Sequence, residues 1–221
     1  MLRKNTVHNG DCLELMHRID DKSIDMILCD LPYGTTACKW DTIIPFEPLW
    51  EQYKRICKPN AAIVLTASQP FTSDVVMSQR QAFKHEWIWQ KNRGSNFANT
   101  VREPMKEHET VLVFAKSKWT YNPIRQSRTG GGLDRANYKC TFYSDSENYR
   151  KMERREGNEL TEDRVPSSIQ RFNTETGLHP TQKPQKLFEY LIQTYTNEGE
   201  VVCDPFGGSG TTGMVARKHG R

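Results

Sequence analysis

Two short segments of the sequence carry side chains suited to holding a polar ligand. The first follows an apolar run and reads Asp30-Leu31-Pro32-Tyr33-Gly34. Pro32 stiffens this turn, so that Tyr33 is presented as a flat aromatic surface beside a carboxylate. A carboxylate and a rigid aromatic ring are what is needed to hold a planar base with an exocyclic amino group. The pattern is only moderately specific, because such turns also occur by chance.

The second segment is a glycine-rich turn near the C-terminus, between an apolar run and the start of a helix. It reads Asp204-Pro205-Phe206-Gly207-Gly208-Ser209-Gly210-Thr211-Thr212. Glycines let a backbone bend sharply and approach a ligand closely, and the N-terminus of the following helix offers N–H groups to an anion. Asp204 can accept a hydrogen bond from a ligand ammonium. The alternative is a purely structural turn between a strand and a helix.

Alternating strands and helices must position these turns. Continuous apolar runs predict strands at residues 25–30, 61–67, 85–91, 109–116 and 201–206, and apolar spacing predicts helices at 46–57 and 182–196. Continuous runs are typical of strands covered on both faces, so Cys29, Trp87 and Trp89 are expected in the core. The sequence therefore predicts a Rossmann-like, doubly wound α/β fold with a mostly parallel sheet. Both turns would follow the carboxyl ends of strands, where ligand crevices lie.

Residues 118–177 interrupt this alternation. They contain few aliphatic side chains, so we predict an inserted region within one domain formed by residues 1–117 and 178–221. Lys and Arg outnumber Asp and Glu by 12 to 9 in residues 116–176, and aromatic side chains are interleaved with them. This mixture favours contact with nucleic acid over a purely structural loop. We expect contacts with a nucleic-acid backbone from Lys91, Arg93, Arg125 and Arg128; a solvated charged surface is the alternative.

Composition excludes several other classes of protein. The chain has 221 residues and a formal net charge of +4, which fits one domain with an insertion. It has no apolar run of the ~20 residues that a membrane span needs, and no apolar stretch typical of a secretory signal. The six cysteines form no CxxC pair. We therefore expect neither a metal site nor a disulfide framework, and a cytoplasmic location.

Taken together, these segments resemble the beta class of DNA amino-methyltransferases, which use S-adenosylmethionine. The turn at residues 30–33 resembles their catalytic motif, and residues 204–212 resemble their cofactor motif. His179-Pro-Thr-Gln-Lys-Pro184 resembles the element that precedes the cofactor strand, and Asn9-Gly-Asp-Cys12 resembles the segment that reaches the cofactor adenine. The catalytic motif comes first and the cofactor motif last, which is the permuted order of the beta class.

The resemblance implies a role for each matching residue. The catalytic residues would be Asp30, Leu31, Pro32 and Tyr33. The cofactor would be bound by residues from four parts of the chain, namely Asp11, Cys12, Asp30, His179, Lys183, Asp204, Pro205, Phe206, Gly207, Gly208, Ser209, Gly210, Thr211 and Thr212. For His179 and Lys183 the alternative is that the two prolines merely shape a helix start, and for Asp11 it is a turn aspartate.

The sequence departs from the family pattern at two places. Leu31 stands where the family usually has Pro; its carbonyl would still accept a hydrogen bond from the target amino group. The family also continues into a further strand whose acidic residue binds the cofactor ribose, whereas this sequence ends 11 residues after Gly210. We therefore expect the natural chain to be longer; weak cofactor affinity is the alternative.

The function implied by the resemblance is methylation of the N6 amino group of adenine in double-stranded DNA, by a bacterial or phage-encoded protein. Asp30 favours adenine, because the family's cytosine enzymes more often begin the motif with Ser. The alternatives are an N4-cytosine methyltransferase on the same scaffold and a DNA-binding protein without methyltransferase activity. A homodimer is a further expectation, since dimers are common in the family.

Overall fold

The computed structural model describes the chain except for residues 1, 37, 40, 129–162 and 178–181. It divides the chain into two units, which are described separately. The first comprises Met1–Asn122 and Ser168–Arg221, and the second comprises Pro123–Ser167. The elements of the first unit are α1 (Cys12–Met16), β1 (Ile24–Asp30), α2 (Phe46–Ile56), β2 (Cys57–Ala67), α3 (Phe71–Ser78), β3 (Phe83–Gln90), the 3-10 turn η1 (Phe97–Asn99), β4 (His108–Phe114), β7 (Ile169–Arg171), α5 (Gln185–Tyr195), β8 (Val202–Cys203) and α6 (Thr211–Lys218).

A six-stranded sheet forms the centre of the first unit. Its strand order is β7-β3-β4-β2-β1-β8. Strand β1 pairs in parallel with β2 and β8, and β3 pairs in parallel with β7. Strand β4 is antiparallel to both of its neighbours, β2 and β3, so it alone among the described strands of this sheet runs in the opposite direction. The predicted mostly parallel sheet is therefore confirmed.

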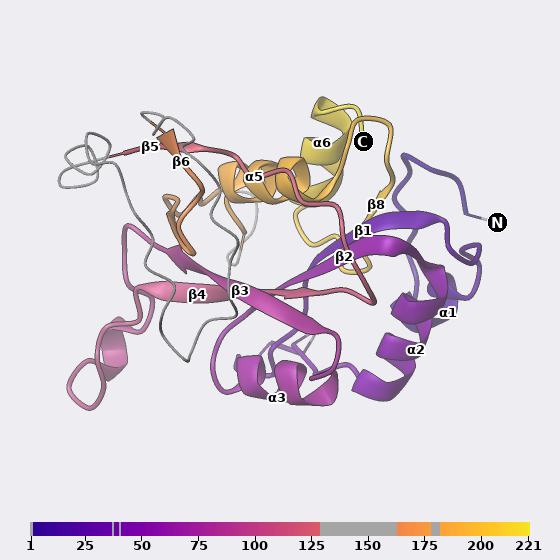
Figure 1. The fold of residues 1–221 in the computed structure, drawn as a ribbon. Helices are drawn as coiled ribbons and strands as arrows, with labels where there is room; N and C mark the ends of the chain where they lie inside the picture. The colour runs from indigo at the N-terminus through magenta and orange to yellow at the C-terminus, as the bar shows by residue number, and fades with distance from the viewer. Residues whose placement is uncertain (1, 37, 40, 129–162, 178–181) are drawn as a thin grey trace, which may run out of the picture. The chain divides into compact units, whose positions relative to one another are not determined.

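Helices cover both faces of this sheet, which makes a three-layer arrangement (Figure 1). Helices α2 and α3 pack on one face, where Leu49, Trp50 and Phe71 join the core cluster that contains Ile27 and Cys29. Helices α5 and α6 cover the other face with a second cluster. Six of the seven residues of β1 are buried, because successive side chains enter opposite cores. This explains why its apolar run is continuous.

The predicted elements differ from the observed ones mainly at their ends. Strand β2 begins four residues before the predicted run at 61–67, and β8 is shorter than the predicted 201–206. Trp87 and Trp89 are 5% and 3% exposed, and Cys29 is fully buried, so their predicted place in the core is confirmed. None of the described helices is long and apolar enough to cross a membrane.

The second unit begins and ends inside the predicted inserted region 118–177. Its described part contains β5 (Gln126–Ser127) and β6 (Asp163–Arg164), which pair antiparallel. The boundary differs from the prediction at the C-terminal side because Ile169–Arg171 forms β7 and joins the main sheet beside β3. Three residues are too few to produce an apolar period in the sequence, so this strand could not be read from it.

Candidate active site at the carboxyl edge of the sheet

The pairing of β1 with β8 brings together the two turns that the sequence analysis identified. Met26 pairs with Val202 and Ile27 with Cys203, in parallel. Since parallel strands end at the same edge of a sheet, the turn after Asp30 and the turn after Cys203 leave from one edge. The influence of Asp30 and Asp204 on a shared neighbour, Cys29, agrees with the closeness of the two turns. The pKa of the buried Cys29 thiol is raised by burial first, and then by the negative charges of both Asp204 and Asp30.

Three side chains hold the carboxylate of Asp30, one from the same turn and two from distant parts of the chain. The Tyr33 hydroxyl donates to Oδ1 at 2.8 Å. The Thr66 hydroxyl donates to the same oxygen, since the parallel register places Thr66 directly beside Asp30. The ammonium of Lys183 lies 2.7 Å from Oδ2. Asp30 therefore accepts bonds on both oxygens and is fixed in orientation.

Lys183 also faces a second carboxylate, that of Glu109 on β4. Its Nζ lies 3.4 Å from Glu109 Oε2, while the ammonium of Lys91 contacts Oε1. Burial alone would raise the pKa of Glu109, but Lys183 and Lys91 together lower it below its usual value. Burial would likewise lower the pKa of Lys183, but Asp30 and Glu109 raise it above its usual value. Both groups are therefore charged at neutral pH.

The aromatic ring of Tyr33 packs against Phe71 and lies near the Lys183 ammonium. It stacks on Phe71, with 5.2 Å between the ring centroids and 27° between the planes. The Lys183 ammonium lies 5.3 Å from the Tyr33 centroid, within cation–π range. The backbone that follows is held by Asp41, whose carboxylate accepts from the N–H groups of residues 34–36 at 2.7–2.9 Å. Tyr33 is thus presented on a constrained backbone.

Leu31 departs from the family pattern for a reason that the packing shows. Its side chain is 4% exposed and lies in the core cluster with Cys29 and Phe71. A leucine therefore contributes apolar contact at this position, while its carbonyl remains a backbone acceptor. Pro32, which follows it, is also buried.

The glycine-rich turn is organised mainly by its own residues. Asp204 accepts from Phe206 N at 2.9 Å and from the Thr212 hydroxyl at 2.6 Å. Burial raises the pKa of Asp204 to about 6. Gly208 and Gly210 adopt positive φ angles of 48° and 77°, which side-chain-bearing residues rarely adopt. The turn therefore depends on glycine at these positions.

The space beside this turn fits the adenosyl cofactor that the sequence implies. No heavy atom lies within 4 Å of the position that a Cβ would take at Gly207 or Gly210, so the backbone there is open to a ligand. Helix α6 begins with no side-chain cap, which leaves the N–H groups of its first turn available to a ligand carboxylate. Asp204, Gly207 and Gly210 would lie against the cofactor.

Comparison with known proteins decides the family. The model of the N6/N4 methylases, described as "DNA methylase", matches residues 24–221. The chain belongs to this DNA methylase family. The predicted relationship to the DNA amino-methyltransferases is therefore confirmed, and the site at the sheet edge lies within the residues that the family model matches.

Curated relatives in this family are type II methyltransferases and an adenine methyltransferase. M.HpaI of Haemophilus parainfluenzae is 27% identical over 94% of this chain and 65% of its own length. M1.MboII of Moraxella bovis is 25% identical over 100% of this chain and 90% of its own length. The DNA adenine methyltransferase YhdJ of Escherichia coli is 27% identical over 98% and 76%. The chain thus spans from about two thirds to nine tenths of the length of these three relatives.

Solved structures of methyltransferases share the fold. The complex of M1.HpyAVI with SAM superposes with a TM-score of 0.61 at 23% identity, covering 97% of this chain and 88% of that one. The PvuII cytosine-N4-specific methyltransferase superposes with a TM-score of 0.64 at 17% identity, covering 96% and 77%. The predicted methyltransferase fold is confirmed.

Other predicted site residues of this methylase lie outside the Asp30 cluster. Asp11 caps α1, accepting from Leu13 N and Glu14 N at 2.9 and 3.1 Å, which is the arrangement expected of a turn aspartate. Cys12 is the half-buried first residue of that helix. Among the described residues, no hydrogen bond or ion pair joins Asp11 to Asp30. His179 lies outside the described residues.

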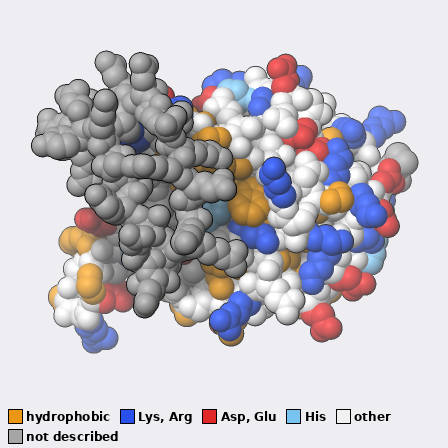
Figure 2. Space-filling model, in the orientation of Figure 1, with side chains coloured by type: hydrophobic (Ala, Val, Ile, Leu, Met, Phe, Trp, Pro, Cys, Tyr) orange, Lys and Arg blue, Asp and Glu red, His pale blue; other side chains and the backbone are white. Residues whose placement is uncertain are grey.

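The basic residues predicted to contact nucleic acid have different surroundings. Lys91 is buried against Glu109, whereas Arg93 is exposed in the loop between β3 and β4. In the second unit, Arg125 pairs with Asp163 at 2.6 Å, and Arg128 is half-buried. On the face shown in Figure 2, Lys and Arg side chains are interspersed with Asp and Glu side chains over the described surface. Surface charge on this face therefore does not by itself locate a DNA-binding region.

Sequence reasoning missed Thr66 and Glu109 as members of the site. Thr66 is a polar residue near the end of an otherwise apolar strand, which is a signal that could have been used. Glu109 lies at the amino end of its strand. It reaches the site only because β4 is antiparallel, which places its first residues at the carboxyl edge of β1 and β2. Strand direction is a tertiary property that the local sequence does not carry.

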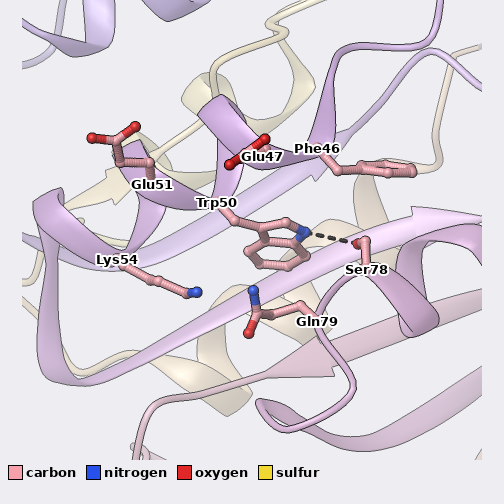
Figure 3. A pocket seen from close by; sticks show the side chains of 7 residues that line it. All are labelled: Phe46, Glu47, Trp50, Glu51, Lys54, Ser78 and Gln79. Carbon is pink, nitrogen blue, oxygen red and sulfur yellow. Dashed lines mark hydrogen bonds between the residues drawn. The ribbon is translucent and has the colours of Figure 1, made fainter.

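A separate pocket lies between α2 and α3, away from this edge (Figure 3). Its volume is about 580 Å³, and it is lined by Phe46, Glu47, Trp50, Glu51, Lys54, Ser78 and Gln79. The Trp50 indole donates to the Ser78 hydroxyl at 2.8 Å and ties the two helices together. The pocket contains none of the residues predicted for the site, so its lining does not support a catalytic role.

Proposed function

We propose that this chain transfers a methyl group from S-adenosylmethionine to the N6 amino group of adenine in double-stranded DNA. The observation that carries the proposal is the position of Asp30. It lies at the sheet edge that also carries the glycine-rich turn, and the distant side chains of Thr66 and Lys183 fix its carboxylate. When bound, S-adenosylmethionine supplies an electrophilic methyl group. All other steps fall to residues of this chain.

Asp30 and Leu31 act on the target amino group. An exocyclic amine is a poor nucleophile because its lone pair is delocalised into the ring. The Asp30 carboxylate and the Leu31 carbonyl accept its two hydrogens, which favours a tetrahedral nitrogen with its lone pair directed at the methyl group. The nitrogen–carbon bond forms as the sulfur–carbon bond breaks, and the proton then leaves the nitrogen toward Asp30. Catalysis here rests on positioning and electrostatics.

Tyr33 holds the extruded base. A base inside a duplex cannot reach a recessed carboxylate, so the target nucleotide must leave the stack. The ring of Tyr33, backed by Phe71, provides an aromatic surface against which the base stacks. Extrusion costs a few kcal/mol. Contacts with DNA phosphates offset this cost, and Arg93 and the inserted region around residues 118–177 are their proposed sources.

Three further assignments belong to the proposal. The inserted region recognises the target sequence, because basic and aromatic side chains are interleaved in its sequence. Asp11, Cys12, His179 and Lys183 contribute to cofactor binding, as the family motifs imply. We also propose a cytoplasmic location and a homodimer.

The choice of adenine rests on two supports. The catalytic turn begins with Asp30 rather than Ser, and a relative that is 27% identical is named a DNA adenine methyltransferase. The second candidate is N4-cytosine methylation, which the family also includes and which the PvuII enzyme with the same fold is named for.

A methylation assay distinguishes these candidates. The chain is incubated with unmethylated duplex DNA and S-adenosylmethionine labelled on its methyl group, and the digested nucleosides are separated. Label in N6-methyl-2′-deoxyadenosine supports the proposal, and label in N4-methyl-2′-deoxycytidine establishes the second candidate. DNA binding without any labelled nucleoside would instead indicate a protein that binds DNA without methylating it.

A further inference from the structure

Four charged side chains of alternating sign form a row behind the catalytic turn. The order is Lys91, Glu109, Lys183 and Asp30, and the side chains are 7%, 13%, 9% and 26% exposed. Two of these residues, Lys183 and Asp30, belong to the family motifs described above. Glu109 touches neither motif in the sequence and lies on a different strand, so its place in the row needs an explanation.

Lys183 is shared unequally between its two carboxylates. Its Nζ lies 2.7 Å from Asp30 Oδ2, which is a hydrogen-bond distance, and 3.4 Å from Glu109 Oε2, which is longer than one. Glu109 Oε2 is buried and accepts no hydrogen bond from the residues that the structure describes, whereas Oε1 is held by Lys91. A buried carboxylate oxygen without a donor is unfavourable. A shift of the ammonium by about 0.6 Å would give it one.

The target amino group would compete with Lys183 for the same atom. Asp30 Oδ1 already accepts from the hydroxyls of Tyr33 and Thr66. Oδ2, which accepts one bond from Lys183, is therefore the oxygen with an acceptor site left for an amino hydrogen. An ammonium that moves aside as the amino group binds must keep a partner, since an unpaired buried charge is costly.

We propose that Glu109 is a positioning residue that takes over the Lys183 ammonium when the target amino group binds Asp30. Lys91 holds the other oxygen of Glu109, so that Oε2 stays directed at Lys183. The transfer moves no net charge out of the row, and Asp30 remains an anion throughout. This inference rests on the proposed methyl transfer, because it concerns how the amino acceptor becomes available.

The directions in which burial and neighbouring charges shift the pKa values of Lys183 and Glu109 agree with such a transfer. The raised pKa of Lys183 keeps it an ammonium in either position, since Asp30 and Glu109 both favour its charged form. The lowered pKa of Glu109 keeps a negative charge ready to receive it. A neutral side chain of the same shape at position 109 would remove this second anchor and also the charged partner of Lys91.

The test compares Glu109→Gln and Glu109→Asp with a matched control elsewhere in the sheet. Asp25 is a buried carboxylate at the opposite end of β1, paired with Lys58 at 2.7 Å. Asp25→Asn therefore removes a buried charge from an ion pair outside the site. For each protein we would measure the single-turnover methylation rate, the dissociation constant of the non-reactive analogue sinefungin, and the melting temperature.

We expect Glu109→Gln to lower the single-turnover rate about tenfold or more, with sinefungin affinity within threefold of the unmodified chain. Glu109→Asp should recover part of the rate, and Asp25→Asn should lower the melting temperature without this loss of rate. A rate within twofold of the unmodified chain in Glu109→Gln, a matching loss in Asp25→Asn, or a collapse of sinefungin binding would each overturn the proposal.

A second measurement does not depend on turnover. A crystal structure of the chain with sinefungin and a target duplex should place Lys183 Nζ within hydrogen-bond distance of Glu109 Oε2 and away from Asp30 Oδ2. An ammonium still bonded to Asp30 beside a bound amino group would overturn the inference. If the unmodified chain methylates no DNA, the proposed function fails in the rate assay, while this structure still decides the movement of Lys183.

Discussion

The two turns at the carboxyl edge of the sheet are built in different ways. The turn at Asp30 is held by side chains from distant segments, since Thr66 and Lys183 both contact its carboxylate. The turn at Asp204 is held by its own residues, with Phe206 N and the Thr212 hydroxyl bonded to the carboxylate and glycines at positive φ. The first turn holds a carboxylate in one orientation, and the second leaves its glycine backbone accessible to a ligand.

This difference suggests a division of work within one site. A group that must direct a reacting atom needs an orientation enforced from several sides. A group that receives a large cofactor needs space and backbone donors, which a local glycine turn supplies. Substitutions in the first turn should therefore change the rate of the chemical step, and substitutions in the second should change cofactor affinity.

The largest effect is expected for Asp30→Ala. Removing the carboxylate removes the acceptor that orients the amino group, so methyl transfer should fall by about a thousandfold or more. Sinefungin affinity should stay within about threefold, because the glycine turn keeps its own bonds. Rate assays and calorimetry check both values. Loss of analogue binding in a folded variant would show that the two turns do not divide the work as described.

Tyr33 tests which part of the first turn holds the base. Tyr33→Ala removes the ring and should weaken capture of the target base by about 1–3 kcal/mol. Tyr33→Phe keeps the ring stacked on Phe71 and loses the hydroxyl bonded to Asp30, at a cost of about 0.5–1.5 kcal/mol. Titration of the two variants with target duplex measures the difference. Equal losses in the two variants would argue against stacking.

Much of this comparison was predictable from sequence, and the rest was not. The Asp30 and Asp204 turns follow short apolar runs and contain Pro and Gly, so local chemistry identified both. Strand β1 was recognisable because it is buried on both faces. Glu109 was not, since its place in the site depends on the antiparallel direction of β4. The pairing of Lys183 with Asp30, 153 positions away, likewise depends on tertiary packing.

A smaller effect is expected for Gly207→Ala, which tests whether the open space at this glycine receives the cofactor. Gly207 has open space at its Cβ position, so Gly207→Ala should leave the melting temperature unchanged but place a methyl group against the cofactor. We expect sinefungin affinity to fall about tenfold. Gly213→Ala within α6 is the control for stability and should stabilise the helix by about 0.5–1 kcal/mol. A sinefungin affinity within about threefold of the unmodified chain in Gly207→Ala would remove Gly207 from the cofactor site.

The smallest effect concerns the pH dependence of stability. The pKa of Asp204 is raised from 3.8 to about 6 by burial. A raised carboxyl pKa means that the folded state binds the proton more tightly than the unfolded chain. The stabilising contribution is therefore full below pH 3.8 and is lost as the pH rises through about 6.

Asp204→Asn should remove the loss of stability that accompanies ionisation of Asp204. The melting temperature of the variant relative to the unmodified chain should therefore increase between pH 4 and pH 7, by an amount read from thermal scans across that range. Because Glu109 has a lowered pKa and the opposite sign, only the difference between the two proteins isolates Asp204. A constant difference over this range would mean that Asp204 is not buried as a charged group.

A crystal structure of the chain with sinefungin would show whether both turns form one site. We expect the analogue to lie against Gly207–Gly210, with the amino group that stands in place of the transferable methyl directed toward Asp30 and Tyr33. An analogue bound elsewhere, for example in the pocket between α2 and α3, or one that turns this end away from Asp30, would contradict it.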